Sequence, residues 1–183
     1  CHLLLSDRQR WFGPLAFLYA WLYGGFILIL ALAAADWVSG FLTERARSPR
    51  VLIHCFTGAL LGLIIHPYFP DNISFLLKSY VEIESGFANH IISGPEDYPY
   101  AASTAVRNAI LVWAAVLIAV LPYLLPPRTL SRHAFTLFLF SIFLLCLYLN
   151  VRRFLEYWPP FALLFAAVAL TPFLQPLRLR HHL

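Results

Sequence analysis

Long runs of apolar residues alternate with short polar segments along most of this 183-residue chain. An α-helix needs about 20 apolar residues to cross a membrane, and five runs approach that length. The five runs are Leu15–Trp37, Arg50–His66, Ala105–Leu125, Ser131–Val151 and Pro160–Leu174. The second and fifth are short, so each needs flanking residues or a thinner membrane region. The pattern predicts an all-α, polytopic transmembrane bundle of about five spanning helices, forming a single domain over residues 1–183.

The longest interruption, residues 67–103, carries a helical pattern of its own. At about 100° per residue, its apolar side chains gather on one helix face. These side chains are Ile73, Leu76, Leu77, Tyr80, Ile83, Phe87 and Ile91, whereas Lys78, Glu82 and Asn89 fall opposite. The periodicity predicts an amphipathic helix that lies in the membrane interface within a long outer loop. Two roles stay open for this helix: it caps the bundle, or it forms a lid over an entrance for a lipid substrate.

The composition agrees with a membrane location. Hydrophobic residues make up 61% of the chain and charged residues only 12%, whereas about a quarter of the residues in soluble domains are charged. The mean hydropathy is +0.73. A soluble core could not bury this much apolar surface at this length, so we expect an integral membrane protein with lipids as its immediate partners.

The basic residues predict an orientation, because cytoplasmic loops are enriched in Lys and Arg. Seven of them follow the first run, follow the third run, or lie in the C-terminal tail: Arg45, Arg47, Arg50, Arg128, Arg132, Arg178 and Arg180. We therefore expect a cytoplasmic C-terminus, an outer N-terminus and an outer loop 67–103, as in a bacterial inner-membrane protein. The opposing side also carries basic residues, including Arg8, Arg10, Arg152 and Arg153. The basic residues are dispersed and form no stripe, which argues against nucleic acid as a partner.

Several familiar catalytic motifs are absent from the sequence. It contains no HExxH, no glycine-rich phosphate loop and no GxSxG, so protease, NTPase and triad-hydrolase classes lack support. The chain starts at Cys1 and contains no methionine. We therefore expect it to be a fragment of a longer protein.

Arg152, Arg153 and Glu156 form a polar cluster between the last two apolar runs. Guanidinium groups bind phosphate bidentately, and charge near membrane depth is costly enough to mark function. Arg152 and Glu156 are four residues apart, so on a continuing helix they would share a face and could pair, leaving one arginine for an anion. Alternatively, both arginines reach the headgroups from a helix end, with Tyr157 and Trp158 as interface anchors.

Two weaker candidates lie at the start of the outer loop and within it. His66 ends the second apolar run; it could transfer a proton or bind phosphate, or it could simply bond to the backbone. Glu96 and Asp97 precede Tyr98, and this acidic-aromatic turn could bind sugar hydroxyls or a divalent cation through oxygen ligands. The same residues also suit a solvated loop with a tyrosine at the membrane interface.

Three segments resemble the GT-C glycosyltransferase superfamily, whose members use polyprenyl-phosphate sugars. They are His66–Asn72, Tyr98–Tyr100 and Arg152–Trp158, the last opening into residues 160–170. The resemblance spans roughly Arg47 to Leu170. It implies that a lipid-linked sugar phosphate enters from the outer leaflet, and that one of the two arginines stabilises the phosphate leaving group.

The same resemblance implies a carboxylate general base in the first outer loop, where similar enzymes keep a catalytic Asp or Glu. Nothing before Leu15 provides such a loop. Either the catalytic segment precedes Cys1 in a longer protein, or this chain is a non-catalytic relative.

Two further classes compete with a glycosyltransferase. A structural or accessory subunit of a membrane complex is suggested by small-residue helix faces, notably the GxxxG match at Gly58 and Gly62. A transporter has less support, because no pair of ionisable residues is evident within the runs and Asp36 falls near the end of the first one. Co-purification at fixed stoichiometry would favour the subunit, and binding of a polyprenyl phosphate would favour the enzyme.

Overall fold

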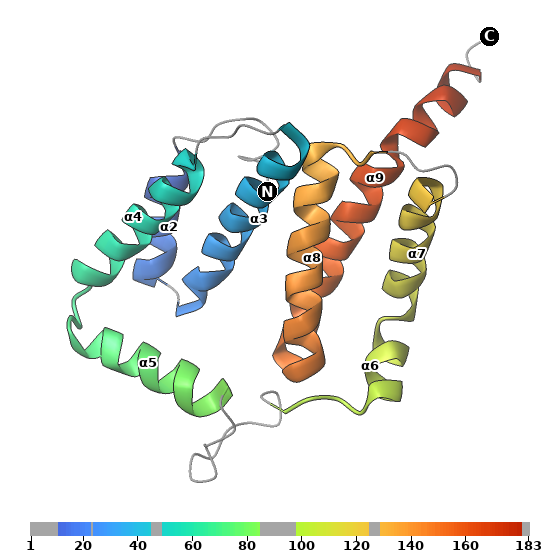
Figure 1. Ribbon diagram of the computed structural model, residues 1–183. Coiled ribbons are helices and arrows are strands. Elements are labelled where there is room, and N and C mark those ends of the chain that lie inside the picture. Colours follow the sequence, from blue (N-terminus) through green and yellow to red (C-terminus); the bar gives the residue numbers. More distant parts are fainter. Residues whose placement is uncertain (1–10, 23, 45–48, 85–97, 125–128, 181–183) are drawn as a thin grey trace. The chain divides into compact units, whose positions relative to one another are not determined.

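The computed structural model describes residues 11–22, 24–44, 49–84, 98–124 and 129–180, and these residues form helices and connecting turns without strands. In chain order the elements are α2 (Phe12–Leu22), the 3₁₀ turn η2 (Gly24–Phe26), α3 (Ile27–Glu44), α4 (Arg50–Ile64), α5 (Asp71–Glu84), α6 (Ala102–Asn108), α7 (Ile110–Leu124), α8 (Arg132–Asn150), the 3₁₀ helix η4 (Arg152–Glu156) and α9 (Trp158–Arg180) (Figure 1). The predicted all-α class is confirmed. Contacts between residues group the helices into two compact units, Cys1–Asp97 and Tyr98–Leu183.

Three helical segments in the described part of the chain are long and apolar enough to cross a membrane: Gly24–Thr43, Arg132–Asn150 and Arg152–Leu174. The pair α6 and α7, bent by 76°, adds a fourth if it forms one broken span. By length and composition, these helices are consistent with an integral membrane protein. The expected number of about five spans is not confirmed, because α4 has only 15 residues and the first and third predicted spans are interrupted.

The predicted first span, Leu15–Trp37, is wrong as a single helix. The chain leaves α2, passes through the 3₁₀ turn at Gly24 and Gly25, and reverses direction into α3 (Figure 1). Two consecutive glycines weaken a helix, because glycine loses more backbone entropy on folding than any other residue. The apolar run is therefore a helical hairpin, and its second arm extends to Glu44.

In the first unit, α2 and α4 pack through small residues. A Cβ atom on Gly58 would overlap the backbone of Gly13, and one on Gly62 would lie 2.6 Å from the carbonyl oxygen of Phe17. The backbones therefore touch, as in membrane helix pairs with small residues at the interface. This register makes α2 and α4 parallel, with α3 antiparallel to both. The start of α2 and the end of α3 consequently lie at the same end of the unit.

In the second unit, α9 packs against both α7 and α8. Aromatic pairs join α8 to α9, among them Phe140 and Phe161 with ring centroids 4.8 Å apart. On the other side of α9, the Tyr123 hydroxyl of α7 donates a 2.6 Å hydrogen bond to the carbonyl oxygen of Ala169. Ring packing and this interhelical hydrogen bond stabilise the three helices as one bundle.

The third predicted span, Ala105–Leu125, is also interrupted, at Ala109. The buried Tyr148 hydroxyl donates a 2.8 Å hydrogen bond to the carbonyl oxygen of Ala105. In a continuous helix that oxygen would accept from the N–H of Ala109, which instead donates to the carbonyl of Val106 at 3.2 Å. A side chain inserted into the hydrogen-bond ladder is a known cause of sharp kinks. The bend between α6 and α7 therefore has a physical cause that lies on α8.

Candidate functional site

Arg152 fastens the segment Tyr98–Tyr100 to the junction between α8 and α9. The guanidinium Nε and Nη2 donate to the carbonyl oxygen of Pro99 at 3.2 and 3.1 Å. The backbone N–H of Arg152 donates to the carbonyl of Tyr98 at 3.2 Å. The guanidinium carbon also lies 4.9 Å from the ring centroid of Tyr100, within the range of a cation–π interaction. We call Arg152 and these three residues the arginine clamp.

The clamp exists because the helix stops before Arg152. Val151 is extended, with φ −139° and ψ 118°, and Arg152–Glu156 then forms a 3₁₀ helix rather than continuing α8. At about 120° per residue, side chains four positions apart on a 3₁₀ helix do not share a face. The continuing α-helix on which Arg152 could pair with Glu156 is therefore not present, and Arg152 bonds to Pro99.

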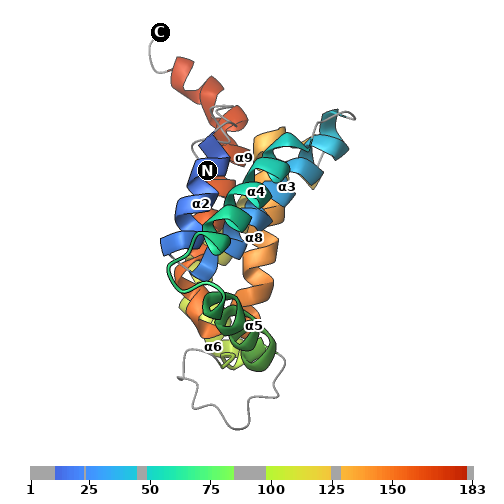
Figure 2. The same ribbon diagram turned by 90° about the vertical axis from the view of Figure 1, so that its left-hand side faces the viewer.

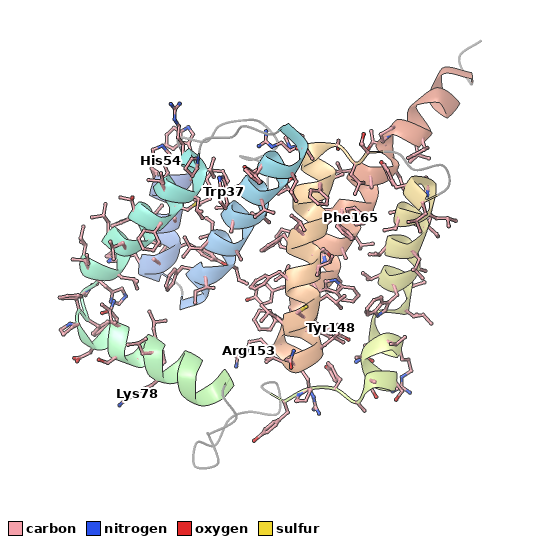
Figure 3. All side chains as sticks on the ribbon, in the orientation of Figure 1. Trp37, His54, Lys78, Tyr148, Arg153 and Phe165 are labelled. Atoms are coloured by element: carbon pink, nitrogen blue, oxygen red, sulfur yellow. The ribbon has the colours of Figure 1, made fainter. Side chains whose placement is uncertain are left out.

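Arg153 and Glu156 are exposed beside the clamp. Figure 3 shows Arg153 at the end of α8. The structure thus brings four predicted site residues to one end of the second unit: Tyr98, Arg152, Arg153 and Glu156.

An aromatic stack connects the clamp to the core of the second unit. The ring centroid of Tyr100 lies 6.2 Å from that of Tyr148, which stacks on Trp158 at 5.4 Å. Trp158 also contacts Trp113 at 4.8 Å and is only 1% exposed. The suggested role of Trp158 as an interface anchor is therefore wrong: it is a core residue that orients the rings beneath Arg152. Sequence reasoning missed Tyr148, whose position within an apolar run marked it only as one more hydrophobic residue.

His66 belongs to the first unit and has a local structural role. Its Nδ1 accepts a hydrogen bond from the backbone N–H of Tyr68 at 3.2 Å, and the two rings lie 5.6 Å apart. Glu96 and Asp97 lie outside the described residues. Within the described part of the chain, no group of three or more His, Cys, Asp or Glu side chains is arranged to hold a metal ion.

Asp36 is a further candidate functional residue, and the sequence pattern placed it wrongly, near the end of a span. The hairpin moves it from the end of a predicted helix into the interior of the membrane-length segment Gly24–Thr43, where it is 1% exposed. Ser39, one turn later on α3, is also fully buried. An ionisable residue buried within a span marks function by default. Treating Gly24-Gly25 as a helix break would have revealed this position from the sequence.

Comparisons with protein-family models, with curated proteins and with solved structures found no match. The resemblance to GT-C enzymes therefore rests on the three short segments alone. Any function assigned to the chain depends on the geometry around Arg152 and on the membrane character of its helices.

Proposed function

We propose that this chain is part of a GT-C-like integral membrane protein that binds the phosphate group of a lipid-linked sugar beside Arg152 and Arg153. One observation carries the proposal: the arginine clamp fixes a guanidinium group where two membrane-length segments, Arg132–Asn150 and Arg152–Leu174, meet. The bonds to Pro99 use only part of the donors of Arg152. The remaining donors are available for an anion. The clamp fixes their position before the anion binds.

The chemistry of this arrangement suits a phosphate leaving group. Donors that are already fixed stabilise developing negative charge without reorganising, which is the most effective form of electrostatic catalysis. Arg153 adds a second positive charge at the same junction. The carboxylate general base that the family resemblance implies is not one of these residues, so their role would be to bind and orient the phosphate.

The test is binding of undecaprenyl phosphate to the purified protein in lipid nanodiscs. We expect Arg153→Ala to weaken binding about tenfold, which corresponds to ~1.4 kcal/mol. Arg152→Lys keeps the charge but loses the planar fork that holds the clamp, so it should also weaken binding. Arg107→Ala removes an exposed arginine from α6 in the same unit and serves as the matched control. Equal affinity in all variants would overturn the proposal.

The alternative function is that of a non-catalytic structural subunit within a larger membrane complex. One argument for it is weakened, because Gly58 and Gly62 pack against α2 of the same chain. The subunit function predicts co-purification with another membrane protein at fixed stoichiometry, and no loss of phosphate binding in the arginine variants.

The orientation that we propose differs from the one suggested by five simple spans. Because α2 and α3 form a hairpin, we assign the sequence that precedes α2 to the same side of the membrane as the sequence that follows α3. If α4, the α6–α7 pair, α8 and α9 each cross, nine of the 13 basic residues fall on that side. The excess favours the cytoplasm of a bacterial inner membrane for this side, and the outer face for the arginine clamp.

A further inference from the structure

We propose that the corner between α4 and α5 is a lipid-binding anchor, in which aromatic and aliphatic side chains of residues 68–77 insert between the headgroups and acyl chains of the bilayer. The corner lies in the first unit and does not involve the arginine clamp. The proposal therefore stands or fails separately from phosphate binding.

The anchor continues an apolar face that already runs along α4. Small residues of α4 face α2, whereas large apolar residues point away from it: Ile53, Phe56, Leu60 and Ile64 are all exposed. Small residues inside and large ones outside are typical of a helix surrounded by lipid. The exposed face does not stop at the end of α4, because Tyr68 is 73% exposed and Phe69 is 49% exposed.

The direction of α5 follows from one contact. A Cβ atom on Gly24 would lie 3.7 Å from Leu76 Cδ2, so the Leu76 side chain faces the end of the first unit. At about 100° per residue, Phe75 and Leu77 then project to either side of Leu76, and Ser74 and Lys78 point away from the bundle. Phe75 is 70% and Leu77 is 60% exposed. Lys78 extends away from α2 and α4 in Figure 3.

Two hydrogen bonds that involve side chains help to hold the corner in place. The Asn72 Nδ2 donates to the carbonyl oxygen of Leu63 at 2.9 Å, and so occupies one of the carbonyls left open at the end of α4. The backbone N–H of Tyr68 donates to His66 Nδ1. Figures 1 and 2 show α5 running across the end of α4. These contacts favour the role of a fixed cap on the first unit and argue against a moving lid.

A lipid interface fits this surface better than water or another protein does. Aromatic rings concentrate at the level of the headgroups, and a helix with apolar flanks and a polar outer face lies flat at that depth. The surface of the corner is continuous with the exposed apolar side of α4, so a single bilayer would cover the corner and α4 together. The polar row formed by Ser74 and Lys78 remains in contact with water and headgroups.

The test is site-directed spin labelling of the whole chain in nanodiscs of phosphatidylethanolamine and phosphatidylglycerol. Single cysteines replace Ser74, Phe75, Leu77 and Lys78 in turn, in a background in which the three native cysteines are alanine. Oxygen concentrates in lipid and a nickel complex stays in water. We expect labels at 75 and 77 to show an oxygen-to-nickel collision ratio several-fold higher than labels at 74 and 78.

Two outcomes would overturn the anchor. Equal ratios at all four positions would mean that α5 has no lipid-facing side: equally low ratios place the helix in water, and equally high ratios place it wholly in the hydrocarbon. Protection of positions 75 and 77 from both reagents would mean that protein, and not lipid, covers the corner. Far-ultraviolet circular dichroism of each labelled variant provides the control for helix content, and loss of phosphate binding in the arginine variants has no bearing on either result.

Discussion

The hydroxyl of Tyr148 donates a hydrogen bond to the backbone carbonyl of Ala105. In a continuous helix this carbonyl would accept from the N–H of Ala109 and join α6 to α7 in a straight line. The donor is fully buried, and its ring stacks on Trp158. Because the hydroxyl and the ring act together, this residue both bends α6 away from α7 and supports the ring of Tyr100 beneath Arg152. A single buried tyrosine thus connects the broken helix to the arginine clamp.

Replacing Tyr148 with phenylalanine should destabilise the second unit by roughly 0.5–1.5 kcal/mol, because the ring stays and only one interhelical hydrogen bond is lost. Reversible unfolding in mixed micelles measures this change. Tyr68→Phe removes a hydroxyl from an exposed ring and is the matched control. A loss no larger than that of the control would mean that the hydrogen bond does not maintain the bend.

At the scale of elements, the contact between α2 and α4 is set by the absence of side chains. Gly58 faces the backbone of Gly13 so closely that no Cβ fits, and Gly62 faces Phe17 in the same way one turn later. Such backbone contact replaces the hydrophobic effect, which does not drive helices together in lipid. This close packing allows an 11-residue helix, α2, to be a stable part of the bundle.

Gly58→Ala should therefore cost about 1–3 kcal/mol of stability, since the two backbones must separate to admit the methyl group. Gly13→Ala, on the facing helix, is the matched control, because its Cβ would lie 3.4 Å from the carbonyl oxygen of His54, an ordinary contact. Thermal unfolding in detergent, followed by circular dichroism, compares the two variants. Equal losses in both would contradict the close approach at Gly58.

At the scale of the whole molecule, the hairpin of α2 and α3 changes the path of the chain through the membrane. A single helix over Leu15–Trp37 would place its two ends on opposite faces. The parallel contact of α2 with α4, and the short connection from α3 to α4, instead place Trp11 and Pro49 at one end of the first unit and Tyr68 at the other.

Cysteines introduced separately at positions 11, 49 and 68 of a cysteine-free chain test this path. In sealed vesicles, a membrane-impermeant maleimide should label positions 11 and 49 from one side and position 68 from the other. All three native residues are exposed, so each site should be reachable. Labelling of position 11 together with position 68 would restore the single first span and refute the hairpin.

The sequence by itself determined the helical class, the membrane location and the polar junction at Arg152 and Arg153. These properties depend on composition and on periodicity within short windows, which each residue contributes through its own hydrophobicity. The glycine pair at Gly24 also carried a readable signal, and recognising it would have located Asp36 inside a span.

Only the tertiary structure decided where the helices break and which groups the polar residues contact. The hydrogen bond that bends α6 from α7 joins residues 43 positions apart, and the bond between Arg152 and Pro99 spans 53 positions. Local patterns cannot report such pairs, because neither the Ala105 carbonyl nor the Pro99 carbonyl differs in sequence from any other backbone oxygen. Which carbonyl a buried hydroxyl or guanidinium reaches depends on how distant helices pack, and that is a property of the folded chain.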